Sequence, residues 1–473
     1  MVQEQLSQNL LQTLVVHSSG FDSLSAGASG LPTFQKILGW QNHWGKSLAA
    51  RAKRLEQQPT QRASAQDFDY DLAIVGGGIV GATLACALKD SGLTVALIEA
   101  QSQPEAVAKG QAYAIHLIAS QIYQGIGVWE AIAPSVEAFK QVHLSDADYP
   151  HIVQFQPADL QAEALGYVAE HQVLLGALQE FLQNCPHVTW LCPARVSETI
   201  FHSSGVEVQL STVASHSDIA ETPKSIRVRL LVAADGTRSQ IRQNAGIRTH
   251  GWEYWQSCIV ATITPEKPHN NIAYERFWPS GPFAILPLPQ NRCRIVWTVP
   301  HTEAQALVAL DDQQFLQELK QRYGNHMGEL SLIGKRFIFP VKLMHTRRYI
   351  LPRLALIGDS AHACHPVGGQ GLNMGIRDAA VLAQVLRSAH QTGEDIGNLK
   401  VLKRYERWRR PENLAILGFT DFLDRLFSNH WLPLVVLRRL GLRIMRSSQP
   451  FRVYTLKFMA GLNGRSLEVT QPR

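Results

Sequence analysis

Apolar and polar positions alternate in blocks between residues 71 and 99. Leu72–Val75 is a short apolar run, which predicts a buried parallel strand. A helical pattern follows over Thr83–Lys89, and Gly92 ends it, because glycine readily adopts the positive φ found after helices. Leu93–Ile98 is a second apolar run and predicts a second buried strand. This order of strand, helix and strand favours an α/β fold around a parallel sheet.

Three glycines stand between the first strand and the helix. Gly76, Gly78 and Gly81 have the spacing G-x-G-x-x-G, in which the glycines allow a tight turn, the approach of a pyrophosphate and close helix–strand packing. The helix N-terminus adds free N–H groups for the phosphates. Glu99, at the end of the second strand, is placed to accept hydrogen bonds from an adenosine ribose and would repel a 2′-phosphate. The motif predicts a dinucleotide site and leaves FAD and NAD open.

The pattern continues with shorter elements. Lys109–Ile132 predicts a strand and then a helix ending near Gly127, and Leu165–Gln183 predicts an amphipathic helix. Residues 251–300 are rich in β-branched and aromatic side chains and predict the sheet of a second domain. Strands are also expected at Val136–Phe155, Val188–Val208, Ser225–Ala234 and Ala355–Ile357, with a polar loop at 211–224 and a helix at Asp311–Tyr323.

Composition limits the classes of function. The chain has 473 residues, enough for two or three domains, and a formal net charge of +6. Its basic residues form no dense run and no nucleic-acid motif occurs, so nucleic acid is not expected as a partner. No uncharged apolar stretch of about 20 residues predicts a membrane span. Six cysteines without a C-x-x-C pair favour a reduced, cytoplasmic compartment.

The two ends of the chain differ from its middle. Residues 1–67 are rich in Gln, Ser and Ala, so we expect a partly disordered extension with one helix near Trp44–Glu56 and no secretory signal. Arg425–Leu467 holds eight Lys or Arg and no acid, interleaved with apolar positions. Such a basic amphipathic segment indicates either a membrane-surface contact or a helix packed on the protein with a solvated basic face.

A second glycine-rich stretch follows a strand that ends at Gly358. Asp359 stands at the carboxyl end of this strand, where ligands of α/β sheets bind. The loop Pro366–Gly371 then opens a helix at about Leu372, which creates a second helix N-terminus that stabilises negative charge. One pyrophosphate uses only one such site. The pyrimidine edge of a flavin becomes negative on reduction, and the second helix N-terminus would stabilise that charge. The sequence therefore favours FAD.

Three motifs resemble those of class A flavoprotein monooxygenases. GDSAHACHPVGGQGLNMGIRD, from Gly358, resembles the motif G-D-A-A-H-x-x-x-P-x-x-G-Q-G-x-N, and LVAADGTRSQIR, Leu231–Arg242, resembles D-G-x-x-S-x-x-R. With the first glycine turn, the motifs occur in the family's order over residues 69–425. Within the class, GYVAEHQVLLGAL, RFWPSGPFAILPL and YERWRRPEN resemble segments of the ubiquinone-biosynthesis hydroxylases.

The resemblance implies a fold and its divisions. It implies an α/β protein with a Rossmann-like FAD-binding domain of the glutathione-reductase and p-hydroxybenzoate-hydroxylase type, an inserted β-sheet substrate domain and a C-terminal helical segment. The expected divisions are an N-terminal extension at 1–67, an FAD-binding domain at 68–137, 161–245 and 345–400, a substrate domain at 138–160 and 246–344, and a basic amphipathic segment at 401–473.

The resemblance also implies a role for each matching residue. The ADP part of FAD would be held by Gly76, Gly78, Gly81 and Glu99, and the ribityl or pyrophosphate oxygens by Asp359. Asp235 and Gly236 would serve FAD and NAD(P)H together, in a loop shaped by Ser239 and Arg242. The flavin's pyrimidine edge would meet backbone amides of Gly369, Gln370, Gly371, Leu372 and Asn373. Catalysis would centre on Pro366, Gly369 and Gln370, with Pro366 beside the ring where family members form the flavin C4a-hydroperoxide.

One position departs from the family pattern. The usual D-x-R-x-x-A-L is KGQAYAI here, so Lys109 replaces the acid and Gln111 replaces the arginine. Gln111 is able to hydrogen-bond the flavin, but not as a fixed cation.

The implied activity is hydroxylation of an aromatic ring with NAD(P)H and O2. The implied substrate is a prenylated phenol of ubiquinone- or plastoquinone-type biosynthesis, with peripheral membrane contact and a quinone-biosynthesis complex as expected partners. Candidate phenol bases are His362, His365 and Tyr113, and the wall over the ring is expected from Phe277–Leu288 and Trp297. His362, Cys364 and His365 also have the residue types of metal ligands, but their Gly and Pro neighbours favour a structural role, and no metal is expected.

Two alternatives share the cofactor. An FAD-dependent reductase or dehydrogenase of an isoprenoid or pigment pathway would not use oxygen on a phenol, and the Pro366–Asn373 loop favours the monooxygenase. A non-catalytic flavoprotein subunit of a quinone-synthesis complex is the other, and Gln111 is its best support.

Overall fold

The computed structural model describes residues 68–147, 149, 151–212, 225–324 and 326–470. All described residues belong to one compact unit, Arg62–Arg473. The expected N-terminal extension, its helix and most of the polar loop at 211–224 lie outside the described residues.

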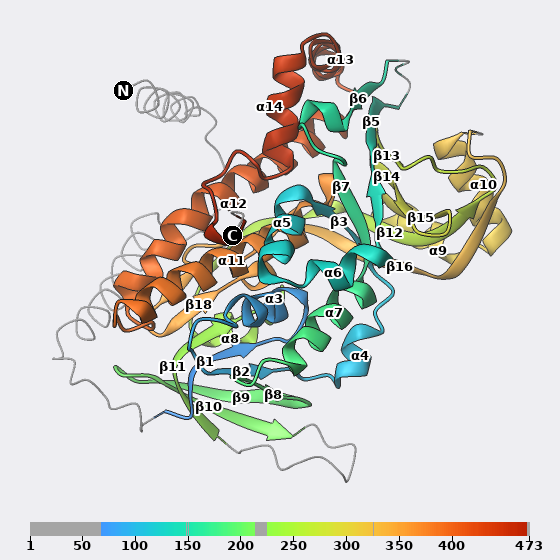
Figure 1. Ribbon diagram of the computed structural model, residues 1–473. Coiled ribbons are helices and arrows are strands. Elements are labelled where there is room, and N and C mark those ends of the chain that lie inside the picture. The colour runs from blue at the N-terminus through green and yellow to red at the C-terminus, as the bar shows by residue number, and fades with distance from the viewer. Residues whose placement is uncertain (1–67, 148, 150, 213–224, 325, 471–473) are drawn as a thin grey trace, which may run out of the picture. The chain divides into compact units, whose positions relative to one another are not determined.

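A mainly parallel sheet is built around β1 (Tyr70–Val75), the first strand that the sequence predicts (Figure 1). β1 lies between β2 (Val95–Ile98) and β11 (Ser225–Ala233) and is parallel to both. The strand order is β17-β18-β11-β1-β2-β8, and a β9–β10 hairpin pairs with β11. The other strands are β8 (Val188–Leu191), β9 (Ala194–Phe201), β10 (Val206–Thr212), β17 (Ile350–Leu351) and β18 (Leu354–Leu356).

Helix α3 (Ile79–Ala87) follows the first glycine turn and begins four residues before the predicted Thr83. Eight of its nine residues are buried, because it packs between the sheet, α7 (His171–Gln183) and α11 (Gln370–Gln391). A helix that is apolar on all sides gives no amphipathic signal, so the pattern did not reveal its start.

Gly166–Glu170 forms a strand, β7, where the sequence predicts the start of a helix, and α7 begins only at His171. β7 pairs with β3 (Ala112–His116) and β4 (Glu137–Phe139) in a three-stranded sheet. Its central residue Val168 is fully buried there, so tertiary pairing overrides the local helical pattern. Helix α5 (Leu117–Ile126) ends as predicted at Gly127, whose φ is 91°.

The β-rich region forms a second large sheet, as predicted, in the order β19-β16-β12-β15-β14-β13-β5-β6. One of its faces packs on α9 (His301–Ala309) and α10 (Asp312–Tyr323). The strands are β5 (Gln141–Asp146), β6 (Val153–Phe155), β12 (Thr249–Pro265), β13 (Ile272–Trp278), β14 (Gly281–Leu288), β15 (Arg292–Pro300), β16 (Leu330–Thr346) and β19 (His362–Ala363).

Trp297 lies on the helix-covered face of this sheet. Its ring packs with Phe283 and with Phe315 of α10. Its strand neighbour Val296 lines a cavity on the opposite face, because successive side chains of a strand alternate. The expectation that Trp297 forms a wall over the substrate ring is therefore wrong, whereas Phe277 does line the cavity.

Three C-terminal helices, orange to red in Figure 1, complete the fold: α12 (Leu399–Phe427), α13 (Leu432–Ser447) and α14 (Gln449–Met459). α12 contacts α11 and α13, and α13 contacts α14. Among the described residues, no helix has the length and hydropathy needed to cross a membrane. The predicted α/β fold with a second sheet and C-terminal helices is thus confirmed.

The remaining helices are short. They are α4 (Gln103–Val107), α6 (Trp129–Ile132), α8 (Gln240–Asn244) and the 3₁₀ turns η3 (Ala133–Ser135), η4 (Pro157–Asp159), η5 (Gly358–Ser360), η6 (Val367–Gly369) and η7 (Glu468–Thr470).

Candidate functional site

The first glycine turn joins β1 to α3 with very close backbone packing. Gly76 has a φ of 106°, and a Cβ there would lie 2.4 Å from the Ala234 carbonyl oxygen. A Cβ on Gly81 would lie 1.9 Å from the Gly76 carbonyl oxygen. At Gly78, by contrast, no described atom lies within 4 Å of an added Cβ. The turn therefore has the shape that the motif predicts, with open space over Gly78 at the N-terminus of α3.

The Glu99 carboxylate lies beside this turn, as the sequence predicts. Its Oε2 accepts a hydrogen bond from the Gly77 N–H at 2.8 Å, and its Oε1 accepts one from the Gln101 N–H at 2.9 Å. These bonds fix the carboxylate at the carboxyl end of β2. Its role toward a ribose stays a prediction.

The loop after β11 carries Asp235 and Gly236 next to the turn. Asp235 Oδ2 accepts a hydrogen bond from a backbone N–H of α8 at 3.3 Å, whereas its buried Oδ1 has no partner among the described residues. Burial raises the pKa of this carboxyl. Ser239 caps α8 by accepting the Arg242 N–H at 3.0 Å, and Arg242 Nη1 donates to the Ser360 carbonyl at 2.9 Å. Ser239 and Arg242 thus shape this loop, as expected.

The second glycine loop turns the chain into α11. Gly368 and Gly369 have φ values of 65° and 62°, in the left-handed region that favours glycine. A Cβ on Gly368 would lie 2.4 Å from Met459 Cε, and one on Gly369 would lie 3.0 Å from Ala114 Cβ. The residues of the first turn of α11 carry N–H groups without acceptors inside the helix, and Gln370, Gly371 and Leu372 all line the cavity.

Two side-chain amides fasten this helix N-terminus. Asn373 Nδ2 donates to the carbonyls of Ala114, at 2.7 Å, and Gly369, at 2.8 Å, while its Oδ1 accepts the His116 N–H at 2.8 Å. Gln370 Nε2 donates to the Met459 carbonyl at 3.0 Å. Asn373 lies behind the cavity wall, so its side chain positions the loop.

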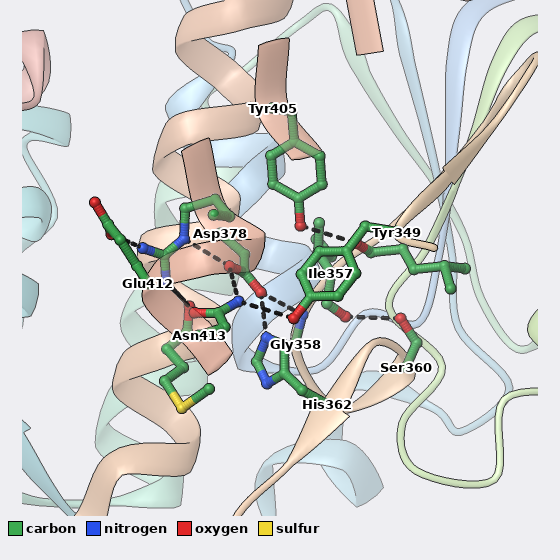
Figure 2. Close-up of polar contacts among 12 residues, drawn as sticks. Tyr349, Ile357, Gly358, Ser360, His362, Asp378, Tyr405, Glu412 and Asn413 are labelled. Atoms are coloured by element: carbon green, nitrogen blue, oxygen red, sulfur yellow. Dashed lines mark hydrogen bonds and ion pairs between the residues drawn. The ribbon is translucent and has the colours of Figure 1, made fainter. Parts of the chain in front are cut away.

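A buried polar network supports the turn that presents Asp359 (Figure 2). The Gly358 N–H donates to Asp378 Oδ2 at 3.1 Å, and His362 Nε2 lies 2.6 Å from the same oxygen. Asp359 itself opens into the cavity. Burial raises the pKa of the Asp359 carboxyl, and the charges of His362 and Lys342 oppose this shift.

The same network joins α11 to α12 through Asp378. Its Oδ1 accepts hydrogen bonds from Arg409 Nε at 2.7 Å and from Asn413 Nδ2 at 3.0 Å. Arg409 also forms an ion pair with Glu412. Burial alone would raise the pKa of Asp378, but the charges of His362 and Arg409 and two hydrogen bonds hold it well below its ordinary value.

One cavity of about 580 Å³ joins the two glycine loops. This volume lies within the range of small-molecule and cofactor sites. Five predicted site residues do not line it, namely Gly76, Gly81, Glu99, Asp235 and Asn373. The predicted site residues that line it are Gly78, Gln111, Gly236, Asp359, Pro366, Gly369, Gln370, Gly371 and Leu372.

Gln111, the departure from the family pattern, lines the cavity beside Tyr113. The Tyr113 hydroxyl donates to Gln111 Oε1 at 2.7 Å and lies 3.2 Å from His171 Nδ1. Burial, and then the charge of Asp359, raise the pKa of Tyr113. Gln111 is therefore held in place through its carbonyl oxygen, and its role toward flavin stays a prediction.

Two of the three candidate phenol bases are wrong. His362 is fully buried against Asp378, and neither it nor His365 lines the cavity. His365 lies between Asp424 Oδ1, at 3.5 Å, and Gln256 Oε1, at 3.4 Å, and burial lowers its pKa to about 3. Within the described part of the chain, no three His, Cys, Asp or Glu side chains gather in a metal-binding cluster.

The donor set fits a flavin dinucleotide. The open space at Gly78 is where a pyrophosphate would approach one helix N-terminus, and the unpartnered Asp235 Oδ1 offers an acceptor nearby. The N-terminus of α11 lines the same cavity. The positive end of its helix dipole suits the pyrimidine edge of a flavin, which becomes negative on reduction. Fold and site together define an FAD-binding flavoprotein.

Comparison with known proteins supports the assignment to FAD-binding flavoproteins. The family model for the FAD binding domain matches residues 69–420, and the chain belongs to this family. It is 38% identical over 395 residues to ubiquinone hydroxylase UbiL of Rhodospirillum rubrum, covering 83% of this chain and 89% of that protein. It is 33% identical over 401 residues to 3-demethoxyubiquinol 3-hydroxylase of Escherichia coli, covering 83% of this chain and 98% of that protein. The chain is thus an FAD-dependent hydroxylase.

A solved structure supports the fold alone. The p-nitrophenol 4-monooxygenase PnpA of Pseudomonas putida superimposes with a TM-score of 0.70 at 19% identity, covering 84% of this chain and 99% of that one.

Sequence reasoning missed the network around Asp378. Asp378, Arg409 and Asn413 are all buried on helices that the pattern presents as partly polar. The available signal was a charged residue in the apolar stripe of each helix, namely Asp378 before Ala379 and Ala380, and Arg409 within the segment YERWRRPEN.

Proposed function

We propose that this chain hydroxylates the ring of a prenylated phenol in quinone biosynthesis, with NAD(P)H and O2, at a membrane surface. Its similarity to two hydroxylases with ubiquinone-pathway names supports the pathway. The observation that carries the proposal is the shape of the cavity, which reaches from the loop at Pro366 to the C-terminal helices.

The far part of the cavity is apolar. Phe419 and Leu423 of α12, Met445 of α13, and Leu456 and Met459 of α14 line it. A hydrocarbon tail gains about 0.8 kcal/mol for each CH₂ that it buries. A phenol with its ring near the Pro366 loop would therefore be held by its prenyl tail between the C-terminal helices.

The outer side of the same helices supports a membrane contact. On α13, Leu432, Val436, Leu437 and Leu440 are each more than half exposed. Arg443 is also exposed. An exposed apolar stripe with basic neighbours suits an anionic bilayer surface, from which a prenylated substrate would enter.

The residues of the chain bind, orient and shield the reactants. When bound, FAD supplies the redox chemistry with NAD(P)H and O2. The α11 N-terminus would stabilise negative charge at a flavin edge, and the Asp378 network holds that helix to the Asp359 turn. Phe277 and Pro366 position the aromatic ring, and the apolar cavity excludes water from it.

The test uses 2-geranylphenol, a phenol with a short prenyl tail, and isotope-labelled O2. The holoenzyme should insert one labelled oxygen into the ring when NADH or NADPH is present. Met445→Trp, which fills the far part of the cavity, should raise KM for 2-geranylphenol and not for 2-methylphenol. NAD(P)H oxidation without labelled product would instead indicate a reductase, and no NAD(P)H oxidation would indicate a non-catalytic flavoprotein.

A further inference from the structure

Glu275 is an acid on the cavity face of the second sheet. It lies on β13 between Ala273 and Phe277, and all three residues line the cavity. The next residue, Arg276, points to the other face, where its Nη1 donates to the Tyr323 carbonyl at 2.9 Å. The alternation of a strand therefore directs the Glu275 side chain toward the site.

The strand register shows how unusual this acid is. Glu275 pairs with Leu144 of β5 on one side and with Ala284 of β14 on the other. The row continues through Val296 of β15 to Val260 of β12. All five residues line the cavity, and the other four are apolar.

The Glu275 carboxyl has no hydrogen-bond or ion-pair partner among the described residues, and burial alone raises its pKa to about 8. Its titratable neighbours on the sheet are Tyr274, the preceding residue of β13, which also lines the cavity, Cys258 of β12, which feels its charge, and Arg294 of β15, two residues from Val296. Those on the other cavity walls are Tyr113, His116, His171, Asp359 and Cys364. Glu275 is half-buried, and an acid left unpaired in the wall of a ligand cavity is typical of a functional group.

We propose that the Glu275 carboxylate binds the hydroxyl of the phenol substrate and accepts its proton while oxygen is transferred to the ring. This inference rests on the proposed function. The phenol O–H bond breaks, its electron pair stays on the phenol oxygen, and a new O–H bond forms on Glu275. The extra electron density activates the ring carbons ortho and para to that oxygen. The hydroxylated ring carbon then loses its hydrogen as a proton to solvent, and the C–H electron pair restores the aromatic ring. Glu275 returns its own proton to the ring oxygen, so the carboxyl is unchanged overall.

The apolar surroundings match this acid to its task. A phenol has a pKa of about 10, and an ordinary glutamate one of about 4.3, so proton transfer between them is uphill by nearly six pKa units. With the pKa of Glu275 near 8, the gap falls to roughly two units. The carboxyl must be ionised to accept the proton, so both binding and turnover should increase as pH rises through about 8.

The test compares 2-geranylphenol with its methyl ether, which cannot donate a hydrogen bond. Each is titrated into oxidised holoenzyme without NAD(P)H. In the wild-type protein, the preference for the phenol should increase about tenfold as pH rises through the Glu275 titration, because the bond becomes charge-assisted. In Glu275→Gln the preference should not change with pH. Its kcat should fall at least about a hundredfold, with a smaller change in KM.

The control is Glu253→Gln, at an exposed position on β12, which should behave as wild type. A pH-independent preference in the wild-type protein would overturn the role of Glu275, even if the glutamine variant did not fold. Equal pH dependence in Glu275→Gln and wild type would also overturn it. Failure of wild-type protein to bind either compound would instead reject the prenylphenol substrate, and this inference with it.

Discussion

Arg409 Nε lies 2.7 Å from Asp378 Oδ1, and both side chains are fully buried. This ion pair joins α12 to α11, while the other carboxylate oxygen of Asp378 accepts the Gly358 N–H and contacts His362 (Figure 2). Asp359, which follows Gly358 in the chain, opens into the cavity. The position of a cavity carboxylate therefore depends on a charge pair between two helices behind it.

Removing Arg409 should destabilise the protein severely. Arg409→Met leaves Asp378 as a buried charge without its cation, which costs about 3–5 kcal/mol of the free energy of unfolding. The matched control is Arg404→Met on the same helix, because the ion pair of Arg404 with Glu394 is exposed and should contribute little to the free energy of unfolding. Urea unfolding of both variants measures the difference. Similar losses of unfolding free energy in the two variants would contradict a larger contribution from the buried ion pair.

Asp378 should also make stability depend on pH in the acid range. Its pKa is lowered in the folded protein, whereas it is about 3.9 in the unfolded chain. The stabilisation is therefore fully present above about pH 4 and is lost as pH falls from there toward the folded-state pKa. The difference in melting temperature between wild type and Asp378→Asn should be constant from pH 7 to about 5 and should narrow below about 4. A difference that stays constant to pH 3 would contradict this assignment.

The sequence was sufficient where a backbone shape determines the residue type. Gly76 and Gly81 stand where a side chain would collide with the backbone, and the second loop needs the positive φ of Gly368 and Gly369. These constraints act locally, so both loops could be placed before the structure was known. They also predicted that both loops would meet at one ligand site.

The sequence was insufficient where distant segments determine a residue's role. Trp297 has the residue type of a substrate wall, but only the pairing of β15 shows which face it occupies. His362 has the residue type of a base, but α11 brings Asp378 against it. Glu275 stands in an ordinary strand pattern, and only the strands beside it reveal an acid within an apolar row.

Gly78 offers a test of the cofactor site that is separate from folding. Gly78→Ser introduces a side chain where the structure has open space, and serine is a favourable residue before a helix. The melting temperature of the apoprotein should therefore stay close to that of wild type. The Kd for FAD should rise by at least about tenfold, because the new side chain occupies the approach to the backbone.

The control for this change is Gly176→Ser, on α7, where an added Cβ also meets no described atom within 4 Å. This variant should bind FAD as wild type does. Unchanged FAD affinity in Gly78→Ser would place the dinucleotide elsewhere in the molecule.

The exposed stripe on α13 leads to the last prediction. Val436 and Leu440 are 65% and 52% exposed and lie one helical turn apart. Replacing both with Asp removes apolar area and adds two negative charges beside Arg443, so binding to phosphatidylglycerol vesicles should fall at least about tenfold. Binding of the wild-type protein should weaken as salt is added, because basic residues contribute.

The control is Phe201→Asp, at an exposed aromatic side chain on β9, far in sequence from the C-terminal helices. The prediction is tested by vesicle co-sedimentation of the wild-type protein, the α13 double variant and Phe201→Asp. Turnover of 2-methylphenol checks that the site is intact in each. If the α13 double variant and Phe201→Asp sediment equally with vesicles, the stripe is no membrane contact. If the double variant stays in solution but still turns over 2-methylphenol, α13 serves to bring the protein to the bilayer where prenylated substrates reside.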